Sequence, residues 1–383
     1  MELLLAILTL HKDYLMTDKL YVFANMGHLD QLPKSGGQTS ARRVMKGLES
    51  SGFDIIPIRR HRNEWEGRVL HKLEALLFAV VDPVKIISRM LFGKRKNSAF
   101  LHLTYAGPLV PYELFLTILV RVMGYKSLIY LKGGQVLDCY RDGSRMHRWM
   151  FKKTMDMQRK VFFEGMESLR LVEGISNTPL VYFPNYVFDE KILKVLPHKP
   201  KDNIKILYFG RVAPNKNVHV GIEAFNILCE KYDNVHYTII GGLGQSKAYG
   251  DEIDRMISAS PYSDKITRIG NSTQEFLAET MSTHHFFLFP SKEKAEGHSN
   301  SLNEAMSQGL IPIVSDYHFN RTVVGDDRLV VDGFEANAYA EKILWIIENC
   351  DLEVLATQMR DRVREKFAFS VVNQRIADEM RSV

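Results

Sequence analysis

The chain has 383 residues, more than one ordinary hydrophobic core accommodates, so we expect two domains. Apolar residues make up 45% and charged residues 25% of it, which is typical of a soluble globular protein, and no apolar run approaches the ~20 residues that span a bilayer. The net charge of +5 permits an anionic substrate or an anionic membrane surface but demands neither.

Three widely spaced cysteines, Cys139, Cys229 and Cys350, form neither a metal-ligand cluster nor a disulfide framework, so a reducing cytosol fits best. The N-terminal stretch MELLLAILTL is short and carries Glu2 in place of the basic region of a signal peptide. We therefore expect residues 1–15 to be an extension or a start-site artefact that precedes the first strand.

Strand-like and helix-like patterns alternate along the first half. KLYVFANM predicts a strand, SGGQTSARRVMKGLESSG a Gly-rich turn that opens an amphipathic helix, and FDIIPI the next strand. Further strands are predicted at AFLHLTY, SLIYL, KVFFEG and LVYFPN. Such βαβ units indicate a parallel, doubly wound sheet. The polar segment from Leu196 to Lys205, with two prolines, is the expected linker.

A second unit follows the linker. IKILYFG, VHYTIIGG, KITRIG, HHFFLFP and LIPIVSD predict strands, with helices at NVHVGIEAFNILCEKY and after Asn300. The expected fold class is α/β, with two tandem Rossmann-like domains and a cleft between them. We expect an acceptor-side domain over 1–195, a donor-binding domain over 196–365, and a C-terminal helix over 366–383 that packs back on the first domain.

The stretch EGHSNSLNEAM carries two carboxylates, Glu296 and Glu304, separated by seven residues. Glu296 lies in the loop after the strand HHFFLFP, where ligands bind in open α/β sheets, and Glu304 lies in the following helix. Ser299 or Asn300 can cap that helix, whose free N–H groups favour an anion. Carboxylates at the two positions can bind hydroxyls at different ends of an elongated ligand. The alternative is a solvated helix start.

The loop GRVAPNKN, residues 210–217, places Arg211 and Lys216 just before a helix. A helix dipole disfavours cations there by ~0.3–1 kcal/mol each, so the pair indicates a bound anion such as a diphosphate. The alternative is two exposed basic residues.

The loop GGLGQ, with Gly241 and Gly242, is a weak signal because such loops are often simple turns. IGNSTQEF, with Asn271, is well placed for a base or is a plain helix cap.

These motifs together resemble the donor-binding domain of retaining glycosyltransferases with the GT-B fold, glycosyltransferase family 4 (glycosyl transferases group 1). The family pattern has a strand, Gly-Arg, a Lys, and then Glu, seven residues and Glu. Here the same order is carried by a set of positions within residues 204–349: Gly210-Arg211, Lys216, Glu296, Glu304-Ala305-Met306, Gly309 and Pro312.

The resemblance implies roles for these residues. Arg211 and Lys216 would hold the donor diphosphate and, with Glu296, which would bind the transferred sugar, form the catalytic set. Glu304 would bind the ribose hydroxyls. The remaining donor-site residues implied or suggested by neighbouring loops are Gly210, Gly241, Gly242, Asn271, Gly297, His298, Ser299, Asn300 and Ser301.

The first half resembles the family more weakly. Gly36 and Gly37 match its first Gly-rich loop and would face the acceptor side. Where the family often carries a catalytic His, this chain has Lys132-Gly133-Gly134, which we also expect on the acceptor side. His102, in FLHLTY, is a loose substitute, and the favoured interpretation is a buried, hydrogen-bonded histidine.

Two basic regions bear on membrane contact. Residues 62–96 combine apolar residues at helical spacing with basic ends, which fits either a pair of packed helices or a cationic surface on anionic lipid. The stretch from Arg141 to Lys160 adds Trp149 and Phe151 as candidate interfacial anchors.

The predicted function is transfer of a sugar from a nucleoside diphosphate sugar, with UDP-sugar as the expected donor, to a glycan or lipid-linked glycan. Retention of anomeric configuration and bacterial cell-envelope polysaccharide biosynthesis are implied by the resemblance. No Asp-x-Asp motif is present, and we expect no metal, no other cofactor and no nucleic acid partner. The expected location is cytoplasmic, peripheral at the inner membrane face. The alternatives are a nucleotide-sugar epimerase that uses Glu296 and His298, and a non-catalytic nucleotide-sugar-binding subunit.

Overall fold

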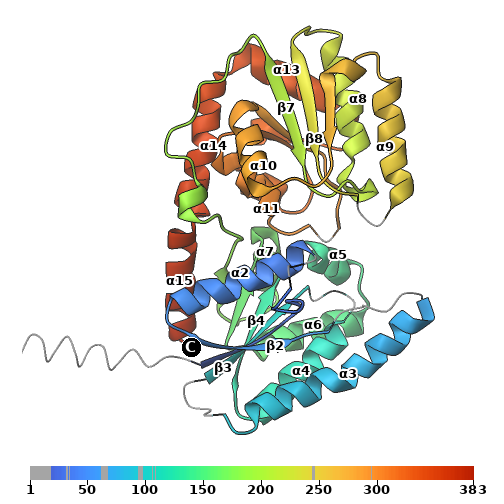
Figure 1. The fold of residues 1–383 in the computed structure, drawn as a ribbon. Helices are drawn as coiled ribbons and strands as arrows, with labels where there is room; N and C mark the ends of the chain where they lie inside the picture. The colour runs from blue at the N-terminus through green and yellow to red at the C-terminus, as the bar shows by residue number, and fades with distance from the viewer. Residues whose placement is uncertain are drawn as a thin grey trace, which may run out of the picture. The chain divides into compact units, whose positions relative to one another are not determined.

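A computed structural model of the chain describes residues 19–383 except 32, 34, 62–67, 94–97, 106, 108, 244, 245 and 295. Two compact units make up the fold, and Figure 1 shows their helices and strands. Unit 1 contains residues 19–164, 168–183 and 373–383, and unit 2 contains residues 165–167 and 184–372. The extension expected over residues 1–15 lies outside the described residues.

Unit 1 is built on a six-stranded parallel sheet of order β2-β1-β3-β4-β5-β6. Its strands are β1 (Lys19–Ala24), β2 (Asp54–Arg59), β3 (Ser98–Thr104), β4 (Lys126–Leu131), β5 (Lys160–Phe163) and β6 (Leu180–Tyr182). The helices of this part are α2 (Gly36–Ser50), α3 (Arg68–Met90), α4 (Val110–Val122), α5 (Gln135–Arg141), α6 (Arg145–Asp156), α7 (Met166–Glu173) and α15 (Phe369–Arg381).

Unit 2 has a second six-stranded parallel sheet of order β12-β11-β10-β7-β8-β9. Its strands are β7 (Ile204–Phe209), β8 (Val235–Ile240), β9 (Ile266–Ile269), β10 (Phe286–Phe289), β11 (Ile311–Ser315) and β12 (Val330–Val331). Its helices are α8 (Val218–Cys229), α9 (Lys247–Ala259), α10 (Gln274–Thr283), α11 (Asn300–Ser307), α12 (Asn320–Val324), α13 (Ala336–Asn349) and α14 (Leu352–Lys366).

The predicted α/β class with two parallel sheets is confirmed, and each predicted strand appears within two or three residues of its expected bounds. The reason is that strands buried on both faces are continuous apolar runs bounded by Gly or polar turns. β12 was not predicted, because two residues are too few to carry a pattern. One of the two interpretations of residues 62–96 was a pair of helices, whereas the described part contains the single helix α3, which continues through Pro83.

The expected domain boundary at residues 195 and 196 falls inside unit 2. Residues 184–195 are attached to that unit by backbone hydrogen bonds, from Leu193 N–H to Ser307 O (3.2 Å) and from Val187 N–H to Phe367 O (2.9 Å). Of the segment expected as a linker, residues 196–203 form no helix or strand, whereas Ile204 and Lys205 begin β7. The chain already belongs to unit 2 before residue 196.

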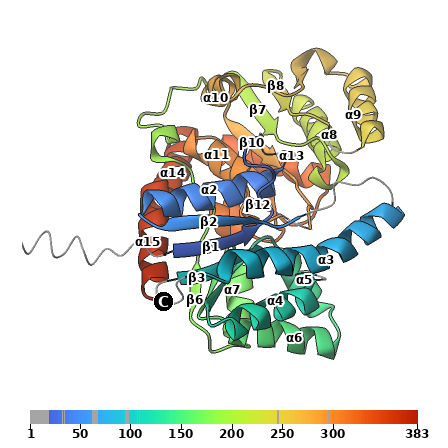
Figure 2. The same ribbon diagram turned by 60° about the horizontal axis from the view of Figure 1, so that its bottom comes forward.

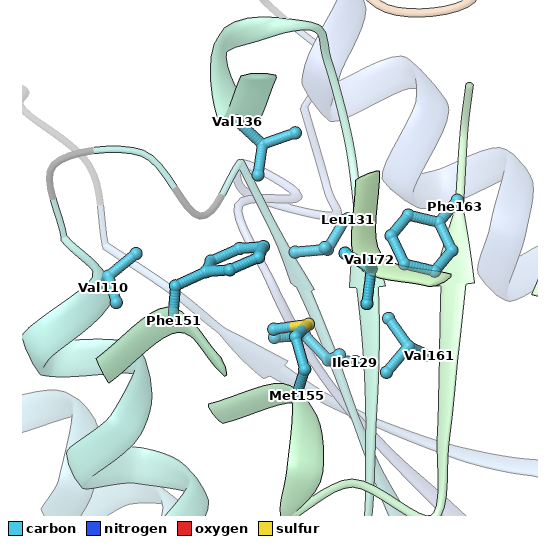
Figure 3. Packing of buried hydrophobic residues seen from close by; sticks show 9 residues of the cluster. All are labelled: Val110, Ile129, Leu131, Val136, Phe151, Met155, Val161, Phe163 and Val172. Carbon is cyan, nitrogen blue, oxygen red and sulfur yellow. The ribbon is translucent and has the colours of Figure 1, made fainter. Parts of the chain in front are cut away.

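The core of unit 1 packs helices α4, α5, α6 and α7 against β4 and β5. Figure 3 shows nine of its side chains: Val110, Ile129, Leu131, Val136, Phe151, Met155, Val161, Phe163 and Val172. Phe151 is one of them and is 1% exposed. It is therefore a core residue, and its prediction as an interfacial anchor is wrong, because positions 151 and 155 lie on the inner side of α6 and Trp149 on the outer side.

Candidate functional site

The strand order of unit 2 locates its candidate site. The chain runs from β7 outward to β8 and β9, then returns to β10 on the other side of β7 and continues to β11 and β12. The order therefore reverses between β7 and β10. In open parallel sheets the crevice at such a switch point, outside the carboxyl ends of the strands, is where ligands bind. The loops after β7 and β10 carry the charged motifs predicted from the sequence.

The loop after β7 has a tightly fixed backbone. Gly210 adopts φ 142°, a backbone conformation that residues with a side chain rarely adopt. The chain then forms a short 3₁₀ turn from Pro214 to Lys216. The Tyr208 hydroxyl donates to Arg211 O (2.7 Å). Asn217 has φ 51° and immediately precedes α8. This backbone holds Arg211 and Lys216 beside the start of that helix.

Side-chain and backbone hydrogen bonds tie the β7 loop to the β10 loop. Asn217 donates through Nδ2 to Pro290 O (3.0 Å), and the Lys292 N–H donates to Asn215 O (2.9 Å). Ser315, at the end of β11, donates to Ser291 O (2.6 Å). The two loops at the switch point therefore form one connected structure.

Each cation of the β7 loop pairs with a carboxylate of the β10 loop. Lys216 Nζ contacts Glu296 Oε2, and both side chains are nearly buried, at 11% and 13% exposed. Arg211 Nη2 lies 3.2 Å from Glu293 Oε2, which also accepts from Asn215 Nδ2. Glu296 further accepts from the Ser291 hydroxyl (3.1 Å). These two carboxylates place negative charge beside the cations, where the sequence had indicated a bound anion.

Helix α11 begins where it was predicted to begin. Ser299 is its N-cap and accepts from Leu302 N–H (3.4 Å), with Asn300 the first helical residue and Ser301 Oγ 3.0 Å from Ser299 Oγ. Glu304 is half-buried on this helix. Gly309, with φ 71°, lies just beyond the helix end, as the sequence predicted.

His298 has a structural environment. Its side chain is 1% exposed, its Nε2 lies 2.9 Å from Asn303 Oδ1, and its ring packs edge-on against Phe367 (4.5 Å between centroids). Its carbonyl accepts from Asn185 Nδ2 (2.7 Å). Any contact between His298 and a ligand would thus come from its main chain, since the imidazole is enclosed by protein.

The glycines at the ends of β7 and β8 pack backbone against backbone. A Cβ on Gly241, which has φ 153°, would lie 1.8 Å from Gly210 O. A Cβ on Gly242 would lie 2.4 Å from Asn271 Oδ1, so the Asn271 side chain occupies the space that Gly242 leaves. The weak GGLGQ signal therefore marks a position where only glycine fits. Gly244 and Gln245 lie outside the described residues.

Unit 1 has its own switch point, between β1 and β3. Gly36 and Gly37 open α2, whose N-cap Ser35 accepts from Gln38 N–H (3.3 Å). A Cβ on Gly37 would lie 2.7 Å from the Tyr105 hydroxyl, so the two residues are neighbours. The Gly-rich loop and the segment after β3 thus lie together at the carboxyl end of this sheet.

Lys132 is buried at the carboxyl end of β4, at 4% exposed. Its ammonium group lies 3.2 Å from Glu164 Oε1 and also contacts the Ser40 hydroxyl of α2. Glu164 Oε2 accepts from Gly133 N–H (2.8 Å). Burial lowers the pKa of Lys132, and Glu164 acts in the opposite direction. This pair anchors the Gly133-Gly134 turn, a role for Glu164 that nothing in its sequence neighbourhood indicated.

His102 is buried and hydrogen-bonded, as the favoured interpretation had it. It lies 2.9 Å from Glu113 Oε2 and 3.1 Å from Arg60 Nη1, and Thr104 donates to Glu113 Oε1 (2.7 Å). Burial raises the pKa of Glu113, but His102 and Arg60 outweigh it and bring the value to about 2. Glu113 is therefore ionised at neutral pH, and His102 belongs to a buried polar network.

Two further observations concern binding capacity. Within the described ranges, no group of three or more His, Cys, Asp or Glu side chains is arranged to hold a metal ion.

A pocket of about 380 Å³ lies at the amino-terminal edge of the unit 2 sheet, where Lys199, His285 and Ile311 help to line it. This pocket is at the opposite edge from the β7–β10 loops and is not part of the candidate site.

Comparisons with known proteins find glycosyltransferases among the relatives of this chain. Residues 189–366 match the model of the family Glycosyl transferases group 1. The chain is 24% identical over 203 residues to the capsular polysaccharide biosynthesis glycosyltransferase CapM of Staphylococcus aureus. That match covers 52% of each protein, so the chain spans about half the length of this curated relative.

Solved structures share the whole fold. A sucrose-phosphate synthase from Thermosynechococcus elongatus superimposes with a TM-score of 0.72 at 17% identity, covering 95% of this chain and 98% of that one. Anabaena Alr3699/HepE in complex with UDP gives a TM-score of 0.69 at 12% identity, covering 96% and 100%. The two-sheet architecture is thus the GT-B fold.

Proposed function

Because residues 189–366 match the model of the family Glycosyl transferases group 1, we propose that the protein is a glycosyltransferase. It moves a sugar from a nucleoside diphosphate sugar to a hydroxyl of a glycan or lipid-linked glycan, with retention at the anomeric carbon. The observation that carries this proposal is the meeting of Arg211 and Lys216 with Glu293 and Glu296 at the β7–β10 switch point.

The proposed donor is a UDP-sugar. Support comes from the structural likeness to HepE, whose structure contains UDP. Arg211 and Lys216 would take the diphosphate, together with the N-terminal N–H groups of α11. Glu304, within α11, would accept hydrogen bonds from the ribose, and Asn271, beside Gly242, would face the base.

Departure of the diphosphate is the costly step, because negative charge builds on the leaving oxygens while the sugar becomes oxocarbenium-like. Cations and helix N–H groups that are already in place stabilise this charge without reorganising at the moment of reaction. Glu296 would then lie beside the sugar, where its negative charge stabilises the positive charge that develops on the oxocarbenium-like ring. With these groups supplying the electrostatics, we propose a metal-independent reaction with no further cofactor.

The pathway and location are part of the same proposal. Similarity to CapM favours bacterial capsule or other cell-envelope polysaccharide biosynthesis, with a lipid-linked glycan as the acceptor. Among the described helices, none combines the length and apolar character that crossing a bilayer requires. We propose a cytoplasmic protein held peripherally at the inner face of the cell membrane.

The epimerase alternative is weakened by the environment of His298. That reaction needs acid and base side chains beside the sugar ring, and the His298 imidazole is buried against Asn303 and Phe367. A non-catalytic nucleotide-binding subunit is disfavoured by Glu296, which a purely diphosphate-binding site would not require.

The test is a donor panel followed by turnover. Purified protein is screened against UDP-, GDP- and ADP-sugars by thermal shift, and the best donor is then incubated with and without a lipid-linked acceptor. UDP release that requires the acceptor supports the proposal. Epimerisation of the donor without acceptor would establish the epimerase instead, and binding without either reaction would establish the non-catalytic subunit.

A further inference from the structure

Helix α3 presents an apolar stripe on its outer side. Six of its side chains, together with two in the following turn, are between 36% and 93% exposed: Leu73, Leu76, Leu77, Val80, Val84 and Ile87, then Leu91 and Phe92. Their spacing of three and four residues puts them on one side of the helix. From Leu73 to Leu91 the stripe is about 27 Å long at 1.5 Å per residue.

The inner side of α3 carries the helix's acidic groups. Glu74 and Asp82 are buried, Glu74 Oε1 lying 2.7 Å from His61 Nε2 and Asp82 Oδ1 lying 3.1 Å from Lys85 Nζ. Ile86 and Met90 join the core of unit 1 on the same inner side. A surface helix of a soluble protein has its apolar stripe inward and its charges outward. In α3 the acids lie inside and the apolar stripe outside.

Neighbouring helices extend the exposed apolar area. Phe115, Ile118 and Val122 of α4 are 43–81% exposed, and Met146 and Trp149 of α6 are more than half exposed. α3 packs against α4, and α4 packs against α6. Figures 1 and 2 both show these three helices grouped on one side of the unit 1 sheet, away from α2 and α15. We call this surface the α3–α4–α6 face.

Cations dominate the charged groups on this face. Its exposed basic side chains are Lys72, Arg89, Arg121, Arg145, Arg148, Lys152 and Lys153. Among the described residues of the three helices, the exposed acid is Asp156, which pairs with Lys152 (2.9 Å). The face thus combines an apolar centre, an exposed tryptophan and a basic periphery.

We propose that the α3–α4–α6 face docks on an anionic lipid bilayer, with α3 lying in the plane of the interface. The apolar stripe would enter the boundary between head groups and acyl chains, while the surrounding lysines and arginines would contact anionic head groups. A second copy of the chain fits less well, because a two-fold contact through this face would bring together two surfaces that are both positively charged. The inference stands independently of the glycosyltransferase proposal.

The test is co-sedimentation of the full chain with vesicles. We expect binding to phosphatidylcholine vesicles that contain roughly 30% phosphatidylglycerol and little binding to pure phosphatidylcholine, with salt weakening the interaction. The double variant Leu76→Asp/Val80→Asp should bind at least 10-fold more weakly. The control is Val354→Asp/Val371→Asp, which alters two exposed apolar side chains on α14 and α15, outside the α3–α4–α6 face, and should bind like the wild type.

Folding and donor binding are checked in the same variants. The melting temperature, and the UDP affinity by calorimetry, should be unchanged in both double variants. Vesicle binding and thermal unfolding need no donor, so a failure of the glycosyltransferase proposal would not affect this test. The proposal is overturned if the wild type ignores anionic vesicles at low salt, or if Leu76→Asp/Val80→Asp binds them like the wild type. It is also overturned if ultracentrifugation finds a dimer that this variant converts to monomer, because the face would then be a self-association surface.

Discussion

Arg211 and Lys216 carry the same charge in different surroundings. The Arg211 side chain is 56% exposed and pairs with Glu293 at 3.2 Å. Lys216 is 11% exposed, contacts Glu296, and lies 5.4 Å from the centre of the Phe289 ring. An exposed ion pair contributes ~0.2–1 kcal/mol, whereas leaving one charge of a buried pair without its partner costs ~3–5 kcal/mol.

We therefore predict that Arg211→Ala and Lys216→Ala affect stability differently. Each should lower kcat by ~10²–10³-fold, because each removes a charge that stabilises the leaving diphosphate. Only Lys216→Ala should lower the melting temperature clearly, because it leaves Glu296 nearly buried and unpaired. Steady-state kinetics and thermal unfolding measure both effects, with the exposed neighbour Lys292→Ala as the control. Near-wild-type turnover in both variants would refute the assignment.

The carboxylates Glu296 and Glu304 should also differ. Glu304→Gln should mainly weaken donor binding, since a charge-assisted contact to the ribose becomes a neutral one, about half as strong. Glu296→Gln should lower kcat more than donor affinity, because its partner changes charge and shape at the transition state. Calorimetry for binding and initial rates for turnover separate the two. Equal behaviour of the variants would contradict the proposed roles.

The charged loop positions were predictable, but their pairing was not. Arg211, Lys216 and Glu296 follow predicted strands, and strand ends share one sheet edge. That Glu296 faces Lys216 depends on β10 lying beside β7, a long-range pairing that no local pattern carries. Glu293 was missed because an acidic residue between Lys292 and Lys294 in a polar loop has the signature of a solvated side chain.

At the level of elements, the glycines that follow β7 and β8 hold the ends of these strands together by backbone hydrogen bonds. Gly210 N–H donates to Ile240 O and Gly241 N–H donates to Ile269 O, both at 3.0 Å. These bonds continue the sheet into the loops that carry the charged residues. The closeness of the Gly210 and Gly241 backbones leaves no room for a side chain, so the loop geometry depends on this contact.

We predict that Gly241→Ala destabilises the protein by ~2–4 kcal/mol, because a Cβ would overlap the Gly210 carbonyl and φ 153° disfavours a side chain. UDP affinity should fall with it. Gly270→Ala is the matched control at the end of β9, where a Cβ would meet nothing within 4 Å. Urea unfolding and calorimetry give the two readouts. A Gly241→Ala protein as stable as Gly270→Ala would show that the loops can adjust.

The helices and strands differ in how well the sequence predicted them. Buried parallel strands such as β4 and β7 are apolar throughout, so their position follows from composition alone. The periodicity of α3 indicated a helical segment but not its orientation, because sequence periodicity defines an apolar side without saying what covers it. Only the buried positions of Glu74 and Asp82 reveal that this side is turned outward.

For the molecule as a whole, the two units should respond to acid at different pH. His284 donates through Nδ1 to Thr280 O (2.7 Å), and His285 Nδ1 accepts from Lys205 N–H (3.2 Å). Burial lowers the pKa of both from 6.5 to about 4. Folding therefore favours their neutral forms, and the stability this gives unit 2 is present above pH 6.5 and is lost as the pH falls toward 4.

Unit 1 contains a group whose contribution to stability is lost at lower pH. Glu113 has its pKa lowered from 4.5 to about 2, so its contribution is present above pH 4.5 and is lost only below that. We predict that hydrogen exchange of unit 2 peptides accelerates first on acidification, before that of unit 1 peptides. His284→Gln/His285→Gln should flatten the pH dependence of unit 2 between pH 6.5 and 4. Earlier loss of protection in unit 1 would contradict this.

The order of the units along the chain has a consequence for how the protein is made. Unit 1 includes residues 373–383, where Ile376, Ala377 and Met380 are buried, and Lys160 donates to the Glu379 carboxylate (2.5 Å). A ribosome synthesises all of unit 2 before it adds these residues. Unit 1 therefore cannot complete its fold until residues 373–383 have been made, although its first strands are made before any of the unit 2 sheet. A premature stop codon shortly before residue 373 would damage the unit encoded at the start of the message.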